Sequence, residues 1–256
     1  MMKKLSACRS TSCYSSRSLF GRIYFSPMEE TLKRGARVLD VGAGPGLWIR
    51  DMAEQYPNSH FTGTDAMIYP ISTPPKNCQL RIADAAEGLP FPDNTFDFVL
   101  QHDGLMRYTH SEWDMAIKEL VRVLKPGGWI ELVECSCALQ DIGPNLSIWL
   151  MRLTVSLQSR NINVKMASQL NRYLEKAGSL ENVEFSHRSV PIGWLGKLGD
   201  LMLECMERLF DSMKPRLCED WSMSLSKYDK IVQAASKECR EFKSWTNVHY
   251  AYGRKL

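Results

Sequence analysis

Residues 38–46 read Val-Leu-Asp-Val-Gly-Ala-Gly-Pro-Gly, a short apolar run that ends in closely spaced glycines. Its first four residues are typical of a buried strand. The glycines that follow permit a tight turn and the close approach of a ligand to the backbone. A helix is expected next, from Trp48 to Tyr56. A strand, a glycine turn and a helix in this order predict a βαβ unit that binds a ligand at the carboxyl end of its strand.

The spacing of the glycines and the acids around them narrow the choice of ligand. The glycines have the spacing GxGxG, and Asp40 lies two positions ahead of the first of them. A dinucleotide-binding fingerprint is GxGxxG, so this spacing disfavours a nicotinamide oxidoreductase. Asp65 ends the next strand run, where a carboxylate can accept both hydroxyls of a ribose and would repel a 2′-phosphate. A cap or turn role for Asp65 is the less favoured interpretation. For Asp84, after the third strand, a hydrogen bond to an adenine amino group and a turn-capping role both stay open.

The rest of the chain alternates strand and helix signals, which favours an α/β fold with a mostly parallel sheet. A helix is expected after residue 110, capped by Ser111 and Asp114 and ended by Lys125-Pro126-Gly127-Gly128. A Met-rich helix runs up to Pro215, and core packing explains its apolar spacing better than a binding face does. Strands are expected at residues 36–41, 60–65, 78–84, 96–101, 129–134, 182–190 and 246–252, and further helices at 147–158, 163–177 and 223–243.

Five segments in the first half carry a resemblance to a known family. They are VLDVGAGPG, FTGTDA, the Asp84-Ala85 pair, LPFPDNTFDFVL and RVLKPGGWIELVE, which together cover residues 36–134. In this order and spacing they resemble class I S-adenosylmethionine-dependent methyltransferases. The second half resembles fungal members of the family, some of them linked to secondary metabolism. Leu19-Phe20-Gly21 and Phe25-Ser26-Pro27 are similar to the segment that leads into the domain in that group.

The resemblance implies a Rossmann-like, seven-stranded, mostly parallel sheet with helices on both faces, helical cap insertions, and the last strand inserted antiparallel between the fifth and sixth. It implies a single methyltransferase domain at residues 29–256 after a basic tail at 1–28. Residues 36–134 would form the cofactor-binding core, and residues 135–256 the substrate cap and the last two strands. The cofactor would be S-adenosyl-L-methionine, held by Asp40, Gly42, Ala43, Gly44, Gly46, Asp65, Ala66, Asp84, Ala85 and Gln101, with Gln101 on the methionine part.

Transfer of a methyl group from a sulfonium depends mainly on in-line alignment of the reacting atoms. If the acceptor is a hydroxyl or a protonated amine, His102 or His110 could take its proton, although a surface or capping role is common for such histidines. Asp103, Arg107, Tyr108 and Trp113 fall near the expected cleft, with Trp113 assigned to the helix core. Gln101-His102-Asp103-Gly104 replaces the Asn-Pro-Pro-Tyr pattern of enzymes that methylate nucleobases or glutamine, so we expect a small-molecule acceptor. A cofactor-binding regulatory protein with little catalytic activity is the alternative.

Charge and cysteine content limit the partners, metal sites and cellular locations that the sequence allows. The net charge of +3 comes from five basic residues in the acid-free first 28 residues, and the other 228 carry 27 basic and 29 acidic side chains. Nucleic acid is therefore not an expected partner, and an oligomer or protein partner stays open. No apolar run reaches the roughly 18 to 20 residues of a membrane span. The eight cysteines lack zinc-site spacing, although Cys135 and Cys137 form a CxC, so we expect no metal and a reducing, cytoplasmic location. The basic, Ser-rich first 28 residues fit either an irregular tail or a mitochondrial transit peptide.

Overall fold

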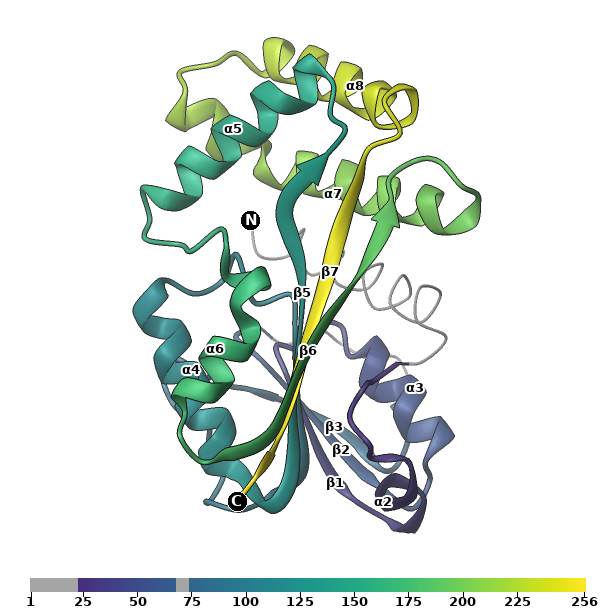
Figure 1. The fold of residues 1–256 in the computed structure, drawn as a ribbon, viewed down its shortest axis with the longest axis vertical. Helices are drawn as coiled ribbons and strands as arrows, with labels where there is room; N and C mark the ends of the chain where they lie inside the picture. Colours follow the sequence, from purple (N-terminus) through teal and green to yellow (C-terminus); the bar gives the residue numbers. More distant parts are fainter. Residues whose placement is uncertain (1–22, 68–73) are drawn as a thin grey trace.

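The stretch at residues 38–46 forms most of strand β1 and the turn after it, at the centre of a sheet. The structure is a computed structural model that describes residues 23–67 and 74–256, and the expectations for Leu19-Phe20-Gly21 and the rest of residues 1–22 lie outside this part. Within it, one sheet has the strand order β3-β2-β1-β4-β5-β7-β6 (Figure 1). The strands are β1 (Arg37–Val41), β2 (His60–Asp65), β3 (Cys78–Ile82), β4 (Phe96–His102), β5 (Leu124–Gln140), β6 (Leu180–Pro191) and β7 (Trp245–Lys255).

The sheet is mixed in the way that the resemblance implied. Strands β1 to β5 pair in parallel, with Val38 opposite Phe98 on β4 and Leu39 opposite Thr62 on β2. Strand β7 lies between β5 and β6 and is antiparallel to both. Since parallel strands need crossover helices, the sheet is covered on both faces. The predicted α/β class and the position of the last strand are confirmed.

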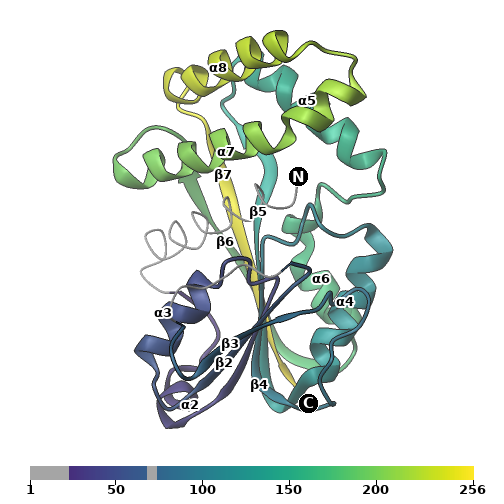
Figure 2. The same cartoon turned by 180° about the vertical axis from the view of Figure 1, so that it is seen from behind.

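Helices cover both faces of the sheet, and three more helices form a layer over one end of its strands. Helices α2 and α3 lie on one face, α4 and α6 lie on the other, and α5, α7 and α8 form a layer over the carboxyl ends of the parallel strands (Figures 1 and 2). The bounds are α2 (Glu29–Arg34), α3 (Leu47–Gln55), α4 (His110–Val123), α5 (Pro144–Gln158), a 3-10 turn η1 (Met166–Gln169), α6 (Leu170–Lys176), α7 (Lys197–Asp220) and α8 (Leu225–Glu241).

The two faces of the sheet bury separate apolar cores, because successive strand side chains point to opposite sides. Leu39 and Val41 of β1 pack with α4 and α6. Val38 packs on the other face, with Trp48 of α3 and Met28. This second core continues into the layer of α5, α7 and α8, where Met202, Met206 and Met213 are buried, as core packing predicted.

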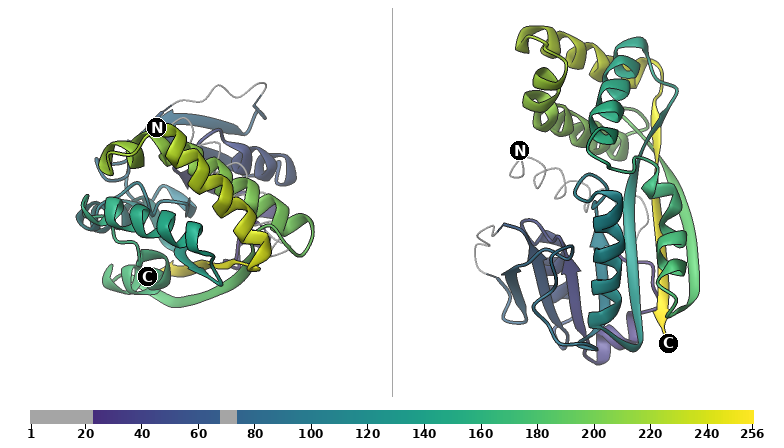
Figure 3. Two further views of the ribbon diagram at one scale, coloured as in Figure 1. Left: turned by 90° about the horizontal axis from the view of Figure 1, so that it is seen from above. Right: turned by 90° about the vertical axis from the view of Figure 1, so that its left-hand side faces the viewer.

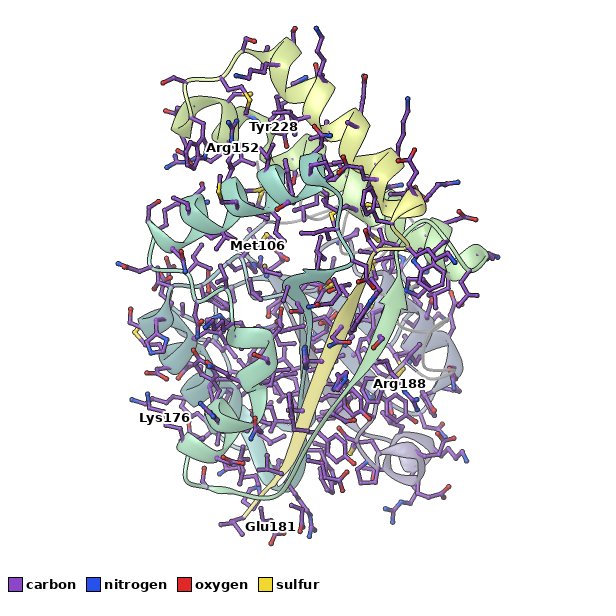
Figure 4. All side chains as sticks on the ribbon, turned by 45° about the horizontal axis from the view of Figure 1, so that its top comes forward. Met106, Arg152, Lys176, Glu181, Arg188 and Tyr228 are labelled. Atoms are coloured by element: carbon purple, nitrogen blue, oxygen red, sulfur yellow. The ribbon has the colours of Figure 1, made fainter. Side chains whose placement is uncertain are left out.

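The helical layer has a buried polar contact at its centre. The Trp149 indole of α5 donates to the Tyr228 hydroxyl of α8 (2.9 Å), which in turn donates to the Phe210 carbonyl of α7 (2.6 Å). Figure 4 shows Tyr228 and Arg152 within this layer and Met106 between it and the sheet, and Figure 3 shows the same layer from above and from the side. The contact therefore joins all three helices. No helix in the described ranges is long and apolar enough to cross a membrane.

Three details of the helices differ from the sequence predictions. The cap of α4 is Thr109 with Glu112, not Ser111 with Asp114, because Glu112 reaches back to the Thr109 amide (2.7 Å) and completes a capping box. Residues 163–177 form η1 and then α6 rather than one helix. Helix α7 continues through Pro215 to Asp220, although an internal proline removes a backbone hydrogen bond. The buried Leu217 and the ion pair of Arg216 with Asp220 (2.9 Å) hold that last part of α7 in place.

Residues 23–28, which by composition belong to the basic tail, pack onto the sheet. Tyr24, Ser26 and Met28 are buried, and the Phe25 ring stacks on Tyr250 at 3.8 Å between centroids. Glu131 of β5 accepts hydrogen bonds from the backbone amides of Phe25 and Ser26 (both 2.8 Å) and from the Ser26 hydroxyl (2.6 Å). Burial raises the pKa of Tyr24, so its hydroxyl stays protonated. In the described part of the chain, the packed domain therefore includes residues before position 29.

Candidate functional site

The glycine turn after β1 has the geometry that the sequence predicted. Gly42, Gly44 and Gly46 all have positive φ angles (75°, 57° and 71°), which other residues adopt only with strain. The Ala43 amide donates to the Thr64 carbonyl of β2 (2.8 Å), which fixes the turn against the neighbouring strand. Helix α3 begins directly after Gly46, so its free amide groups point toward the turn.

Asp65 lies at the carboxyl end of β2, beside the glycine turn. Its side chain is 7% exposed, and one carboxylate oxygen, Oδ2, accepts from the Gly44 amide (3.0 Å). The other oxygen, Oδ1, accepts from Arg107 (3.0 Å) and from the Met67 amide (3.3 Å). Asp65 therefore joins the turn after β1 to the loop after β4. Ala66 follows it at the edge of the sheet and is partly buried.

Two further predicted residues lie in the loop after β3. Asp84 accepts from the Ala86 amide (3.0 Å), while its carbonyl accepts from Glu87 and Gly88 (both 3.1 Å), so Asp84 has the turn-capping contact that local sequence suggested. The side chain of Ala85 is buried in the core formed with α4. A hydrogen bond to adenine uses the same carboxylate and stays a proposal.

Asp40 and Gln101 are buried polar residues on the two central strands. Asp40 is 4% exposed on β1, and its backbone lies opposite Gly63 of β2. Gln101 is 1% exposed at the end of β4, and within the described residues neither atom of its amide has a hydrogen-bond partner. An unpaired buried amide costs about 1 to 3 kcal/mol, so such a group points to a ligand or a bound water.

A glycine beside Gln101 keeps space open for its amide. A Cβ atom on Gly104 would lie 2.4 Å from Gln101 Nε2 and 2.9 Å from the Trp113 ring. Trp113 itself is fully buried against Tyr108 and Tyr173, as its helix-core assignment predicted. Gly63 on β2 leaves room for the glycine turn and for α3, because a Cβ atom there would lie 2.8 Å from Ala43 Cβ and 2.9 Å from Ile49 Cδ1. Both glycines allow close packing around the site.

The loop after β4 is held by a buried carboxylate on the next strand. Glu134, 1% exposed near the middle of β5, accepts from the backbone amides of Gly104 (2.6 Å) and Leu105 (3.0 Å). The Asp103 amide donates to the Val133 carbonyl (3.0 Å), and Asp103 has a positive φ of 52°. These contacts fix the backbone from which the Arg107 side chain extends toward Asp65.

The two candidate bases lie in different surroundings. His102 ends β4 next to Gln101, partly buried, with its ring 6.3 Å from that of Trp48. His110 is exposed at the start of α4, its Nδ1 lies 3.1 Å from the Tyr173 hydroxyl of α6, and its backbone amide donates to the Asn161 carbonyl. The structure therefore does not bring these two histidines together.

Two cysteines of the sheet, Cys78 on β3 and Cys137 on β5, are unsuited to act as nucleophiles. Burial, with a smaller effect of the Asp40 charge, raises the pKa of Cys78 to about 11. Burial and the Glu134 charge raise the pKa of Cys137 to about 12. Both thiols are therefore protonated at neutral pH. Across the described ranges no group of three or more His, Cys, Asp or Glu side chains could hold a metal ion.

One cavity in the described part of the chain lies at the amino ends of the parallel strands, opposite the glycine turn. It has a volume of about 490 Å³ and lies between Met28, Asp97, Trp129 and Arg254, near the amino ends of β4 and β5. Ligands of open parallel sheets bind outside the carboxyl ends of the strands. We therefore place the functional site at the carboxyl ends of the central strands, beside Asp65 and Gln101, rather than in this cavity.

Sequence reasoning located the glycine turn and the strand-end acids but missed the residues that connect them. The sequence places Arg107 near the cleft but does not predict its Asp65 partner, and it gives Glu134 no role at the site. An acid within an otherwise apolar strand was the available signal for Glu134, and a glycine inside a strand was the signal for Gly63. In the fold, the glycine turn, Asp65, Gln101 and the Arg107 loop meet at the carboxyl edge of the central strands.

This arrangement defines a class of doubly wound α/β proteins that bind a nucleoside-containing cofactor at the first glycine turn. Comparison with known proteins makes the class specific. Residues 38–128 match the methyltransferase domain. The secondary metabolism regulator laeA of Coprinopsis cinerea is 26% identical over 192 residues, which are 68% of this chain and 47% of that protein. The N-methyltransferase sirN of Leptosphaeria maculans is 24% identical over 92% of this chain and 86% of sirN.

Solved structures give the same result for the fold. Phosphoethanolamine N-methyltransferase 2 of Haemonchus contortus, in complex with S-adenosyl-L-methionine, has a TM-score of 0.53 at 20% identity and covers 96% of this chain and 57% of its own. The chain thus spans about half the length of laeA and most of sirN. These similarities agree with the resemblance of its motifs to class I S-adenosylmethionine-dependent methyltransferases.

The residues at the site fit the cofactor of this class, S-adenosyl-L-methionine. A glycine turn against β2, a buried carboxylate beside it and an unpaired amide at the end of β4 are suited to a ligand that offers hydroxyl and amino groups. Asp65 would hold the ribose, Asp84 with Ala85 the adenine, and Gln101 the methionine part. The other residues that would contact the cofactor are Asp40, Gly42, Ala43, Gly44, Gly46 and Ala66.

Replacing Gln101 with leucine is expected to stabilise the cofactor-free protein and weaken cofactor binding. Leucine is close in size to glutamine and removes the unpaired amide, so the free energy of unfolding should rise by about 1 to 3 kcal/mol. Each kcal/mol should raise Tm by roughly 2–4 °C. Thermal unfolding and titration with S-adenosylhomocysteine measure both effects. The matched control is Gln79→Leu, because the Gln79 amide is bonded to Thr62 (3.1 Å) and its loss should not stabilise. A Gln101→Leu protein that is less stable than the wild type would contradict the prediction.

Proposed function

We propose that the protein transfers a methyl group from S-adenosylmethionine to a small-molecule acceptor. The contact that supports this most directly is the hydrogen bond from the Gly44 amide to Asp65, which places a buried carboxylate beside the glycine turn. When bound, the cofactor supplies a methyl group that is already activated by the adjacent sulfonium charge. The task of the chain is then to hold the acceptor in line and to exclude water, which can contribute on the order of 7 to 11 kcal/mol.

The chain's own residues divide this work. Gln101 and the glycine turn orient the cofactor, Glu134 positions the loop after β4, and the layer of α5, α7 and α8 lies over the same edge of the sheet. If the acceptor must lose a proton, His102 is the better-placed base. It adjoins Gln101, whereas a ring nitrogen of His110 lies within hydrogen-bond distance of Tyr173.

Titration calorimetry tests the proposed function. S-adenosylmethionine and S-adenosylhomocysteine should bind and NAD should not, and incubation with methyl-labelled cofactor and a panel of small hydroxyl and amino compounds should yield a labelled product. Failure of folded protein to bind either S-adenosyl compound would overturn the proposal. The folded state is checked by circular dichroism on the same sample.

A regulatory role without turnover is the second candidate, and it is supported by the similarity to a protein named as a secondary metabolism regulator. In that case the fold and the cofactor site serve binding rather than chemistry. Binding of S-adenosylmethionine without label transfer to any compound of the panel or of a host extract favours this alternative.

A further inference from the structure

Arg107 lies across the position where the cofactor is proposed to bind. It extends from the loop after β4 to Asp65 at the end of β2, and β1 with its glycine turn lies between these two strands. The distance from β4 to β2 is two strand spacings, about 9.5 Å. The Arg107 side chain must therefore cross the carboxyl end of β1 to reach Asp65, over the same turn that would hold the cofactor.

Arg107 also uses the carboxylate that the ribose would need. Asp65 Oδ2 accepts from Gly44 and Oδ1 accepts from Arg107, and the Asp65 side chain is only 7% exposed while that of Arg107 is 26% exposed. Oδ1 also accepts from the Met67 amide, so with Arg107 in place both of its acceptor sites are filled and a ribose hydroxyl cannot bind there. Cofactor binding through Asp65 thus requires Arg107 to leave.

The side chain of Arg107 can move without its backbone. Glu134 holds the amides of Gly104 and Leu105, the Arg107 amide donates to the Gly104 carbonyl (2.9 Å), and the capping box at Thr109 begins two residues later. The backbone of Arg107 is thus held in the loop that follows β4. An arginine stays charged under all ordinary conditions and is costly to leave without an anion.

We propose that Arg107 exchanges Asp65 for an anionic group of the acceptor: the cofactor takes over Asp65, and the released guanidinium binds a carboxylate or phosphate on the molecule to be methylated. This inference rests on the proposed function and names its substrate class. It makes binding ordered, with the cofactor first. It also couples the two ligands. The acceptor binds better once the cofactor has released Arg107 from Asp65, and the cofactor binds better once an anionic acceptor holds Arg107.

The test compares S-adenosylhomocysteine binding by the wild type, Arg107→Gln and Arg107→Lys by calorimetry, in chloride and with inorganic phosphate or acetate at matched ionic strength. In chloride, Arg107→Gln should bind about 3- to 30-fold tighter, because no charged side chain competes for Asp65. Phosphate or acetate should tighten binding by the wild type about threefold or more and leave Arg107→Gln unchanged. Arg107→Lys keeps the charge but not the planar fork, so its values should lie between the two. Arg34→Gln, at an exposed position on α2, is the matched control and should behave as the wild type.

Two results would overturn the proposal. Equal affinity of the wild type and Arg107→Gln in chloride would show that Arg107 does not compete for Asp65. A wild type that responds to neither anion would show that the released guanidinium pairs elsewhere, for instance with Asp103 of the same loop. In both cases the proposed function stands as long as the wild type binds S-adenosylhomocysteine, whereas loss of that binding in folded wild-type protein removes both proposals.

Discussion

Replacing Asp65 with alanine is expected to weaken S-adenosylhomocysteine binding about 10- to 100-fold. Each hydrogen bond from a ribose hydroxyl to a charged carboxylate contributes about 1.5 to 3 kcal/mol, and 1.4 kcal/mol corresponds to a factor of ten. The loss is smaller than the sum of two such bonds, because the wild type must first separate Arg107 from Asp65. Titration calorimetry of folded protein measures the difference.

Three variants separate the contribution of the ribose contact from other effects. Asp65→Asn keeps one oxygen as acceptor and should show a smaller loss. Asp114→Ala removes an acid of α4 that pairs with the exposed Lys176, and its cofactor affinity should equal that of the wild type. Combining Asp65→Ala with Arg107→Gln should show no gain from the second change, since the partner of Arg107 is already gone. An unchanged affinity of Asp65→Ala would refute the ribose assignment.

The strands and the central site could be predicted because their signals are local. The apolar run ending at Asp40-Val41, followed by closely spaced glycines, contains within nine residues the strand, the turn and the ligand position. The position of Asp65 could be predicted for the same reason, since it ends a short strand. Both signals depend on the chain within a few residues, which is the range in which pattern and propensity act.

The contacts that complete the site are non-local and could not be predicted. Arg107 and Asp65 are 42 positions apart and meet only because the strand order places β1 between β2 and β4. The continuation of α7 past Pro215 depends on tertiary packing of Leu217, which outweighs the local cost of the proline. Glu131 and Ser26 are 105 positions apart, so a boundary placed at residue 28 from composition alone could not include their contact.

Replacing Glu131 with alanine is expected to produce the largest loss of stability. Its buried carboxylate is the acceptor for two backbone amides and one hydroxyl of Phe25 and Ser26, at 2.6 to 2.8 Å. Removing it leaves these donors without a partner, so the free energy of unfolding should fall by about 3 to 5 kcal/mol. At roughly 2–4 °C per kcal/mol, Tm should fall by about 10 °C. Thermal and urea unfolding measure the change.

A local measurement distinguishes loss of this contact from general destabilisation. The amides of Phe25 and Ser26 should exchange with solvent faster than those of β1 in Glu131→Ala, because the segment at residues 23–28 loses its main polar attachment. The fluorescence of Trp48 should also change, since its indole donates to the Ile23 carbonyl (2.8 Å). Ser26→Ala removes one donor and should lower the free energy of unfolding by about 1 kcal/mol. The control is Glu184→Ala, at an exposed position where the carboxylate accepts from the Tyr252 hydroxyl. Wild-type exchange at both amides in Glu131→Ala would mean that the stacking of Phe25 on Tyr250 and the burial of Tyr24 and Met28 hold the segment without the carboxylate.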